Sequence, residues 1–171
     1  MPDAARYGRR SIRMQGFDYS QSGLYFVTIC AQGHERILGR VFNGNVVLEP
    51  GGLALRDVWL NRNSRFASAV FLDYVVMPNH FHGIIASVDA LPRRGAASSA
   101  PTACTLTLSK MIRAFQSLSA TAVNRALGRR PGPVWQRNFW EHIMADKGEL
   151  RTVREYVPQN PWRWNSNPEN V

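Results

Sequence analysis

Residues Phe71-Leu-Asp-Tyr-Val-Val-Met-Pro-Asn-His-Phe-His-Gly-Ile-Ile-Ala-Ser-Val88 contain two runs of apolar, β-branched and aromatic residues, separated by Pro78-Asn79. Runs of this kind are typical of β-strands, and a Pro-Asn pair is typical of the turn that ends one. The stretch therefore predicts two antiparallel strands, over residues 71–77 and 80–88, joined by a short turn.

Further strands and helices are predicted on both sides of this pair. A β-branched and aromatic run predicts a strand over residues 24–30, and Asn43-Gly-Asn45 predicts a hairpin within residues 41–48. Apolar residues at helical spacing predict helices over residues 50–63 and 106–127. Residues 134–144 predict a fourth strand or an extended segment, and Asp146 with Glu149 predicts the capped start of a last helix over residues 147–160.

The order of these elements is strand, hairpin, helix, two strands, helix, strand, helix. It predicts the α+β class, as a ferredoxin-like antiparallel sheet with helices packed on one face. At 171 residues the chain has the length of one domain. We expect a basic amino-terminal arm over residues 1–23, the domain over residues 24–164, a flexible loop over residues 89–104 and a short tail over residues 165–171.

The composition excludes several classes of protein. Two cysteines do not make a disulfide framework, the first residues lack an apolar signal core, and no uncharged apolar run reaches the length of a membrane span. We therefore expect a soluble cytoplasmic protein with no membrane partner.

The charge pattern favours a polyanionic partner. Lys and Arg number 21 against 12 Asp and Glu, which gives a net charge of +9. Residues 90–140 contain no acidic residue and end in a run with three aromatic rings, a pattern that suits single-stranded nucleic acid. The alternative is a solvated helix face beside a packed aromatic strand. The basic residues of this segment are Arg93, Arg94, Lys110, Arg113, Arg125, Arg129, Arg130 and Arg137.

Two groups of residues suggest chemistry. His80 and His82 are two apart on a predicted strand, so both imidazoles face the same side and suit one divalent metal ion, with Phe81 facing the core. The alternative is a pair of surface or hydrogen-bonded histidines. Tyr156 and Asn160 are four residues apart on the last helix and share a face. The alternatives are that Tyr156 only covers the edge of the core and that Asn160-Pro161 only ends the helix.

Together these groups favour covalent catalysis on a phosphodiester. A tyrosine hydroxyl, with a free pKa of about 10, is a poor nucleophile near neutral pH unless a cation offsets the developing charge. A divalent ion on the phosphate would do so. Attack by Tyr156 would then leave a covalent phosphotyrosine, which conserves the energy of the broken phosphodiester bond for rejoining the strand.

Five sequence blocks in order resemble one family, the REP-associated tyrosine transposases, which are HUH-type single-tyrosine enzymes related to the insertion-sequence 200/605 transposases. The resemblance extends over about residues 9–164. The blocks are Arg9-Arg-Ser-Ile-Arg13 with Gly16-Phe-Asp-Tyr-Ser20, Tyr25-Phe-Val-Thr-Ile-Cys30, Val76-Met-Pro-Asn-His-Phe-His-Gly83, Trp135-Gln-Arg-Asn-Phe-Trp-Glu-His142 and Arg154-Glu-Tyr-Val-Pro-Gln-Asn-Pro161.

The resemblance implies a role for each motif residue. Tyr156 corresponds to the nucleophile that forms a 5′-phosphotyrosine and frees a 3′-hydroxyl, and His80, His82 and Asn160 correspond to the metal ligands. It also implies the HUH nuclease fold, a Mg²⁺ or Mn²⁺ cofactor, a nucleoid-associated location, and single-stranded DNA with hairpins or palindromic repeats as the partner. The tyrosine helix would act in cis in a monomer or in trans in a homodimer. The residues expected to contact DNA phosphates are Arg9, Arg10, Arg13, Lys110, Arg113 and Arg137.

Two features depart from the family pattern. Pro158 lies between Tyr156 and Asn160 and removes a helical hydrogen bond, so a kink is expected there. The chain also ends soon after the last helix.

The alternative function is a domesticated, non-catalytic DNA- or RNA-binding protein on the same scaffold, and a more distant one is a metal-dependent hydrolase of a small phosphoester.

Overall fold

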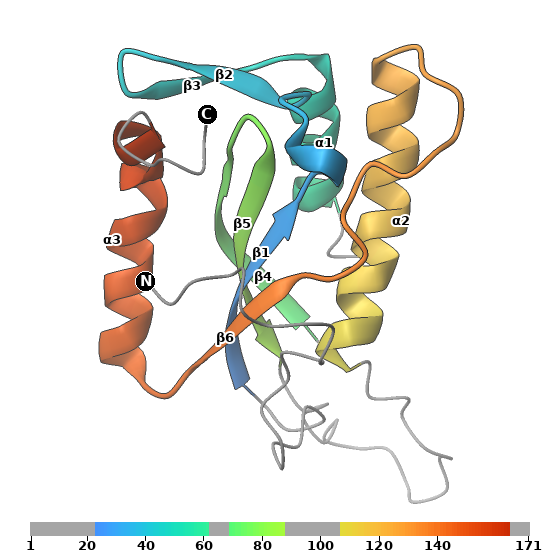
Figure 1. The fold of residues 1–171 in the computed structure, drawn as a ribbon. Helices are drawn as coiled ribbons and strands as arrows, with labels where there is room; N and C mark the ends of the chain where they lie inside the picture. The colour runs from blue at the N-terminus through green and yellow to red at the C-terminus, as the bar shows by residue number, and fades with distance from the viewer. Residues whose placement is uncertain (1–22, 62–68, 88–106, 165–171) are drawn as a thin grey trace, which may run out of the picture.

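A four-stranded antiparallel sheet lies at the centre of the computed structural model, which describes residues 23–61, 69–87 and 107–164 (Figure 1). Across the sheet the strands follow the order β4-β5-β1-β6, which is the ferredoxin-like arrangement. The elements along the chain are β1 (Gly23–Cys30), the 3-10 turn η2 (Gln32–His34), β2 (Gly39–Phe42), β3 (Asn45–Leu48), α1 (Pro50–Leu60), β4 (Ala69–Val76), β5 (His80–Ser87), α2 (Leu108–Ala126), β6 (Trp140–Met144) and α3 (Lys147–Arg163).

The predicted fold class is confirmed, and so are most of its elements. The expected antiparallel pairing of the two strands around Pro78-Asn79 is present as β4 and β5, and the hairpin at Asn43-Gly44 is present as β2 and β3. Both turn residues are in the left-handed region, with φ of 49° at Asn43 and 71° at Gly44, which is the backbone that the Asn-Gly pair favours.

Helices α1 and α2 cover one face of the sheet, as predicted, and enclose the larger hydrophobic core. The fully buried Trp59 lies at the centre of that core. Its ring packs edge-on against Phe71 and Phe115, at 4.9 and 5.4 Å between centroids, and tilted against Phe81, at 4.8 Å.

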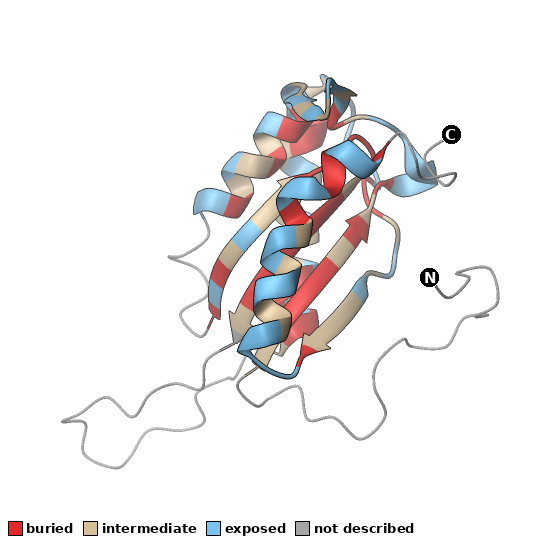
Figure 2. Ribbon diagram, turned by 90° about the vertical axis from the view of Figure 1, so that its left-hand side faces the viewer, coloured by how far each residue is buried: buried red, intermediate tan, exposed pale blue. Residues whose placement is uncertain are grey.

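The third helix differs from the expectation, because α3 packs on the opposite face of the sheet (Figure 1). Its apolar residues Leu150, Val153 and Val157 follow helical spacing and contact a smaller cluster that includes Phe26 and Ile84. Figure 2, viewed from this side, shows α3 with exposed residues outward and the buried residues of the strands behind it. The sheet therefore has helices on both faces.

Helix α3 begins at a side-chain cap and continues through two prolines. The Asp146 side chain accepts a hydrogen bond from the Glu149 backbone N–H (2.9 Å), which confirms the predicted cap. The expected kink does not interrupt the helix, which continues through Pro158 and Pro161 to Arg163. An ion pair between Arg154 and Asp73 (2.7 Å) joins the helix to β4.

Some expected boundaries shift. The extended segment of residues 134–144 forms a strand only over Trp140–Met144, while Trp135 makes an isolated bridge with Ala31. The expected arm, the loop of residues 89–104 and the short tail lie outside the described residues, apart from Gly23, which begins β1. Among the described residues, no helix is both long enough and apolar enough to cross a membrane.

Candidate metal and tyrosine site

Strand β5 places two histidines on the α3 face of the sheet. Its residues alternate between the two faces, so Phe81 and Ile85 belong to the core under α1 and α2, while Ile84 belongs to the cluster under α3. His80 and His82 have the same parity as Ile84 and project with it. The predicted separation of Phe81 from the two imidazoles is therefore present.

The two imidazole rings point their Nε2 atoms at each other and anchor their other nitrogens to neighbours. The Nε2 atoms of His80 and His82 lie 3.0 Å apart. His80 Nδ1 lies 2.7 Å from Asn79 Oδ1, and His82 Nδ1 lies 2.8 Å from the Thr28 hydroxyl, on the strand residue paired with His82. Because an amide oxygen only accepts, His80 carries its proton on Nδ1, and its Nε2 lone pair can accept from the Nε2–H of His82 or bind a metal ion.

Burial keeps both rings neutral at neutral pH. Desolvation, aided by the nearby His34, lowers the pKa of His80 to about 4. Desolvation, aided by His80, lowers the pKa of His82 well below its ordinary value of 6.5. A neutral imidazole has a lone pair to donate, which is the form that binds a metal ion.

Helix α3 lays three side chains along this pair. The Tyr156 ring centroid lies 6.1 Å from that of His82, and the Trp164 ring stacks on His80 at 5.7 Å. Asn160 lies midway between them in the sequence, at the same helical spacing of four residues. It is 8% exposed. Its side chain is therefore on the same face of the helix as the two rings that contact the histidines.

These residues fit a divalent metal ion. Two nitrogens that bind one ion at about 2.1 Å, roughly at right angles, lie about 3 Å apart, which is the separation of the two Nε2 atoms. Asn160 Nδ2 is buried and makes no hydrogen bond to any described residue, and rotating the amide would present Oδ1 in its place. The described residues hold no group of three His, Cys, Asp or Glu side chains suited to a metal, so a third protein ligand to this ion would have to be of another type, such as the Asn160 amide.

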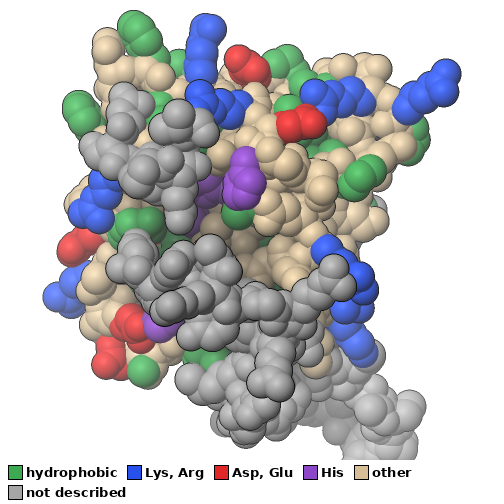
Figure 3. Space-filling model, in the orientation of Figure 1, with side chains coloured by type: hydrophobic (Ala, Val, Ile, Leu, Met, Phe, Trp, Pro, Cys, Tyr) green, Lys and Arg blue, Asp and Glu red, His purple; other side chains and the backbone are tan. Residues whose placement is uncertain are grey.

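Two arginine side chains lie over aromatic rings of the site. The Arg36 guanidinium lies 5.9 Å from the centroid of the Trp164 ring, and the Arg163 guanidinium lies 5.7 Å from that of Tyr156. Figure 3 shows histidine side chains at the surface in the middle of this view of the molecule, with Lys and Arg side chains toward its margins.

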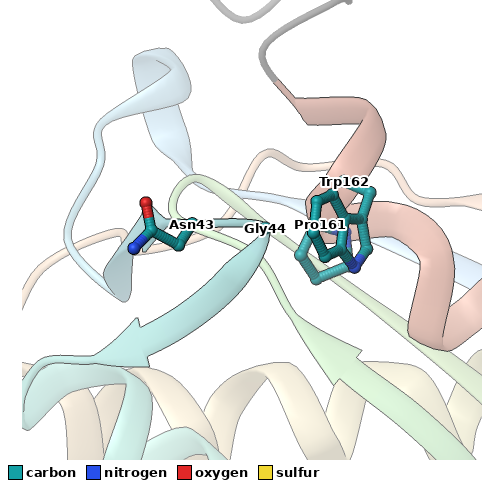
Figure 4. Close-up of a pocket in the computed structure, with 4 residues that line it drawn as sticks. All are labelled: Asn43, Gly44, Pro161 and Trp162. Atoms are coloured by element: carbon teal, nitrogen blue, oxygen red, sulfur yellow. The ribbon is translucent and has the colours of Figure 1, made fainter.

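A separate hollow lies at the end of α3 (Figure 4). It has a volume of about 420 Å³ and is lined by Asn43, Gly44, Pro161 and Trp162. A Cβ atom at Gly44 would lie 2.5 Å from the Trp162 indole, so the hairpin turn packs closely on the ring. The hollow includes none of the residues predicted for the metal or the nucleophile.

The residues predicted to contact DNA are not all brought to this site. Lys110 and Arg113 are exposed on α2, which packs on the other face of the sheet. Arg137 is exposed in the segment before β6. Arg9, Arg10 and Arg13 lie outside the described residues. Their contacts with DNA stay predictions.

Several neighbours of the site were not singled out from the sequence. Thr28 and Asn79 hold the two imidazoles, Phe26 stacks on His82 at 5.2 Å, and Arg163 and Trp164 extend the helix face of Tyr156. The spacing of seven and eight residues from Tyr156 could have indicated the last two. Nothing local in the sequence indicates Thr28, whose place depends on the pairing of β1 with β5.

Comparisons with known proteins relate the chain to a family and to a fold. The chain is 32% identical over 169 residues to a protein of Haemophilus influenzae (strain Rd) named only as uncharacterized, covering 95% of this chain and 93% of that one. A solved structure of a REP-associated tyrosine transposase bound to a REP hairpin matches with a TM-score of 0.56 at 17% identity, over 90% of this chain and 74% of that one.

A second solved structure has the same fold. It is a candidate transposase from Deinococcus radiodurans R1, with a TM-score of 0.50 at 13% identity, over 85% of this chain and 94% of that one. No protein-family model matches the sequence.

Proposed function

Since the chain belongs to the same family as the Haemophilus influenzae protein and has the fold of a tyrosine transposase, we propose that it nicks and rejoins single-stranded DNA with Tyr156 as nucleophile. The observation that supports this most is the Nε2 pair of His80 and His82, 3.0 Å apart, with the Tyr156 ring against His82. The substrate would be DNA with hairpins or palindromic repeats, because the structural neighbour is described as bound to a REP hairpin.

The covalent step conserves the number of phosphodiester bonds. Tyr156 Oη attacks the phosphorus atom, the bond from phosphorus to the 3′-oxygen breaks, and the 3′-oxygen leaves as a hydroxyl with the proton lost by the phenol. The product is a 5′-phosphotyrosine, which a 3′-hydroxyl can attack in the reverse sense to rejoin a strand. Storing the bond in this way suits strand transfer better than hydrolysis.

His80, His82 and Asn160 would hold a divalent ion beside the nucleophile. A bound ion would polarise the scissile phosphate and offset the charge that develops on it. Thr28 and Asn79 keep the imidazoles oriented, because each accepts or donates a hydrogen bond at the outer nitrogen of its ring. The imidazole donors favour Mn²⁺ over Mg²⁺, which prefers an all-oxygen set.

The test is to trap the covalent adduct. Purified protein is incubated with single-stranded hairpin oligonucleotides and Mn²⁺ or Mg²⁺, and a denaturing gel is examined for protein-linked DNA. We expect an adduct with the wild-type protein and none with Tyr156→Phe, while Tyr74→Phe, which deletes the same atom on β4, behaves as wild type. Peptide mapping should place the nucleotide on Tyr156.

Two further variants separate catalysis from binding. His80→Ala with His82→Ala should abolish the adduct while DNA binding persists, because the basic surface is unchanged. Asn160→Ala should weaken Mn²⁺ binding in calorimetry. An adduct that survives Tyr156→Phe would refute the nucleophile, and DNA binding without any adduct in the wild type would favour the non-catalytic alternative.

A further inference from the structure

A guanidinium group lies directly beside the proposed nucleophile. Arg163, in the last turn of α3, has its Cζ atom 5.7 Å from the centroid of the Tyr156 ring. Seven residues separate the two, which is close to two helical turns, so both side chains lie on the same face of the helix. Asn160 lies between them on that face. Arg163 therefore belongs to the side of α3 that faces the histidine pair.

The charge of Arg163 has no carboxylate partner among the described residues. The ion pairs among the described residues include those of Arg56 with Asp57, Arg129 with Glu35, His142 with Glu149 and Arg154 with Asp73, and none of these involves Arg163. The Arg163 side chain is exposed, and its Nη2 donates a hydrogen bond to the Gln159 amide oxygen at 3.3 Å. A neutral amide leaves most of the guanidinium's five donors free for an anion.

A purely structural role accounts for only part of this arrangement. A cation near the carboxyl end of a helix interacts favourably with the helix dipole, and Arg163 stands at that end. A structural cation would serve equally well on any side of the last turn. Arg163 instead lies over the ring of the tyrosine proposed as the nucleophile.

We propose that Arg163 binds the scissile phosphodiester and stabilises the negative charge that forms on it when Tyr156 attacks. The inference rests on the proposed function and adds a catalytic residue to the same site. During the attack the phosphoryl oxygens gain charge as the Oη–phosphorus bond forms and before the 3′-oxygen leaves. A guanidinium fork matches two of those oxygens at once and stays protonated throughout, so it stabilises charge without transferring a proton.

The binding test uses neutral phosphates. A series of hairpin oligonucleotides carries one methylphosphonate each, which removes the charge of a single phosphate. Affinities are measured without metal in a Tyr156→Phe background, where no cleavage occurs, for the Arg163→Met variant, for Arg151→Met and for the unaltered background. Arg151 is an exposed arginine of the same helix that lies about 140° around the helix from Tyr156, so it is a matched control.

We expect one position at which methylphosphonate weakens binding in the background and in Arg151→Met but not in Arg163→Met. That position should be the phosphate that the wild-type protein cuts. Arg163→Met should also flatten the log–log dependence of affinity on salt by about 0.7, the value for one lost phosphate contact on a single strand.

The kinetic test uses the protein with an intact Tyr156. Arg163→Met should slow adduct formation under single-turnover conditions about 100- to 1,000-fold, Arg163→Lys should recover part of that loss, and Arg151→Met should match wild type. Equal rates for Arg163→Met and Arg151→Met would overturn the inference and leave the proposed function intact. A methylphosphonate effect that depends on Arg163 at a phosphate other than the one cut would also overturn it. If wild type forms no adduct, the proposed function fails, and the catalytic role of Arg163 fails with it.

Discussion

Replacing Thr28 with valine removes the hydroxyl that holds His82 while it preserves the shape of the side chain. In the structure that hydroxyl lies 2.8 Å from His82 Nδ1, on the residue of β1 that pairs with His82 across the sheet. A hydroxyl both donates and accepts. It can therefore donate to Nδ1 when His82 carries its proton on Nε2, and accept from Nδ1 when Nε2 binds a metal ion.

The expected loss of metal affinity follows from the unpaired Nδ1 atom of His82 in the valine variant. Losing a neutral hydrogen bond costs about 1 kcal/mol, and leaving the partner buried without one costs about 1–3 kcal/mol. His82 is 7% exposed, so water replaces the hydroxyl poorly. A metal ion polarises the imidazole N–H, so the bond to Thr28 is stronger in the metal-bound state, and a net loss of about 1.5–2.5 kcal/mol corresponds to about 10- to 70-fold weaker ion binding.

The assay is calorimetric titration of Mn²⁺ into wild type, Thr28→Val and Thr28→Ser, with thermal unfolding in EDTA to show that each variant is folded. Thr28→Ser keeps the hydroxyl and should bind Mn²⁺ nearly as wild type. DNA affinity without metal should be the same for all three. If Thr28→Val binds Mn²⁺ as tightly as wild type while His82→Ala does not bind it, then Thr28 does not orient the ligand. If serine and valine weaken binding equally, packing and not the hydroxyl is responsible.

Three further outcomes follow from the fold. Asp146→Ala removes the cap of α3 and should lower the free energy of unfolding by about 1 kcal/mol in urea titrations, whereas an unchanged midpoint would mean that the cap contributes nothing. Gly44→Ala places a Cβ at a φ of 71° and 2.5 Å from the Trp162 indole, so it should destabilise by about 1–2 kcal/mol from the backbone alone, and a raised Tm would contradict this. If the tyrosine acts with the histidines of its own chain, mixing Tyr156→Phe with His82→Ala should give no adduct above that of either variant alone, and an adduct from the mixture would show a site shared between chains.

The features predicted correctly from the sequence depend on neighbouring residues. The left-handed turn at Asn43-Gly44 and the cap between Asp146 and Glu149 are set by a few consecutive residues. The two faces of β5 follow from strict alternation, which separates His80 and His82 from Phe81 without knowledge of what covers either face.

The features that were missed depend on contacts between distant segments. Thr28 reaches His82 only because β1 and β5 pair in one register, and no pattern within either strand fixes that register. The face that α3 covers was also missed, since its apolar stripe of Leu150, Val153 and Val157 would suit either side of the sheet. Arg163 was missed because the expected helix ended at residue 160, before the turn that brings this side chain back to Tyr156.

The docking of α3 decides whether a site exists at all. The helix carries Tyr156 and Asn160, while the sheet carries both histidines, so the site is assembled only when the two layers meet. The connection favours assembly within one chain, because β6 ends at Met144 and α3 begins at Lys147. The apolar cluster beneath the helix is the smaller of the two cores, and one of the contacts that add to it is the exposed pair of Arg154 and Asp73. A salt bridge of that kind contributes little stability. Metal binding by donors from both layers would therefore stabilise the docked helix by mass action. The fraction of molecules in which Tyr156 lies beside the histidines would then increase with the concentration of the ion.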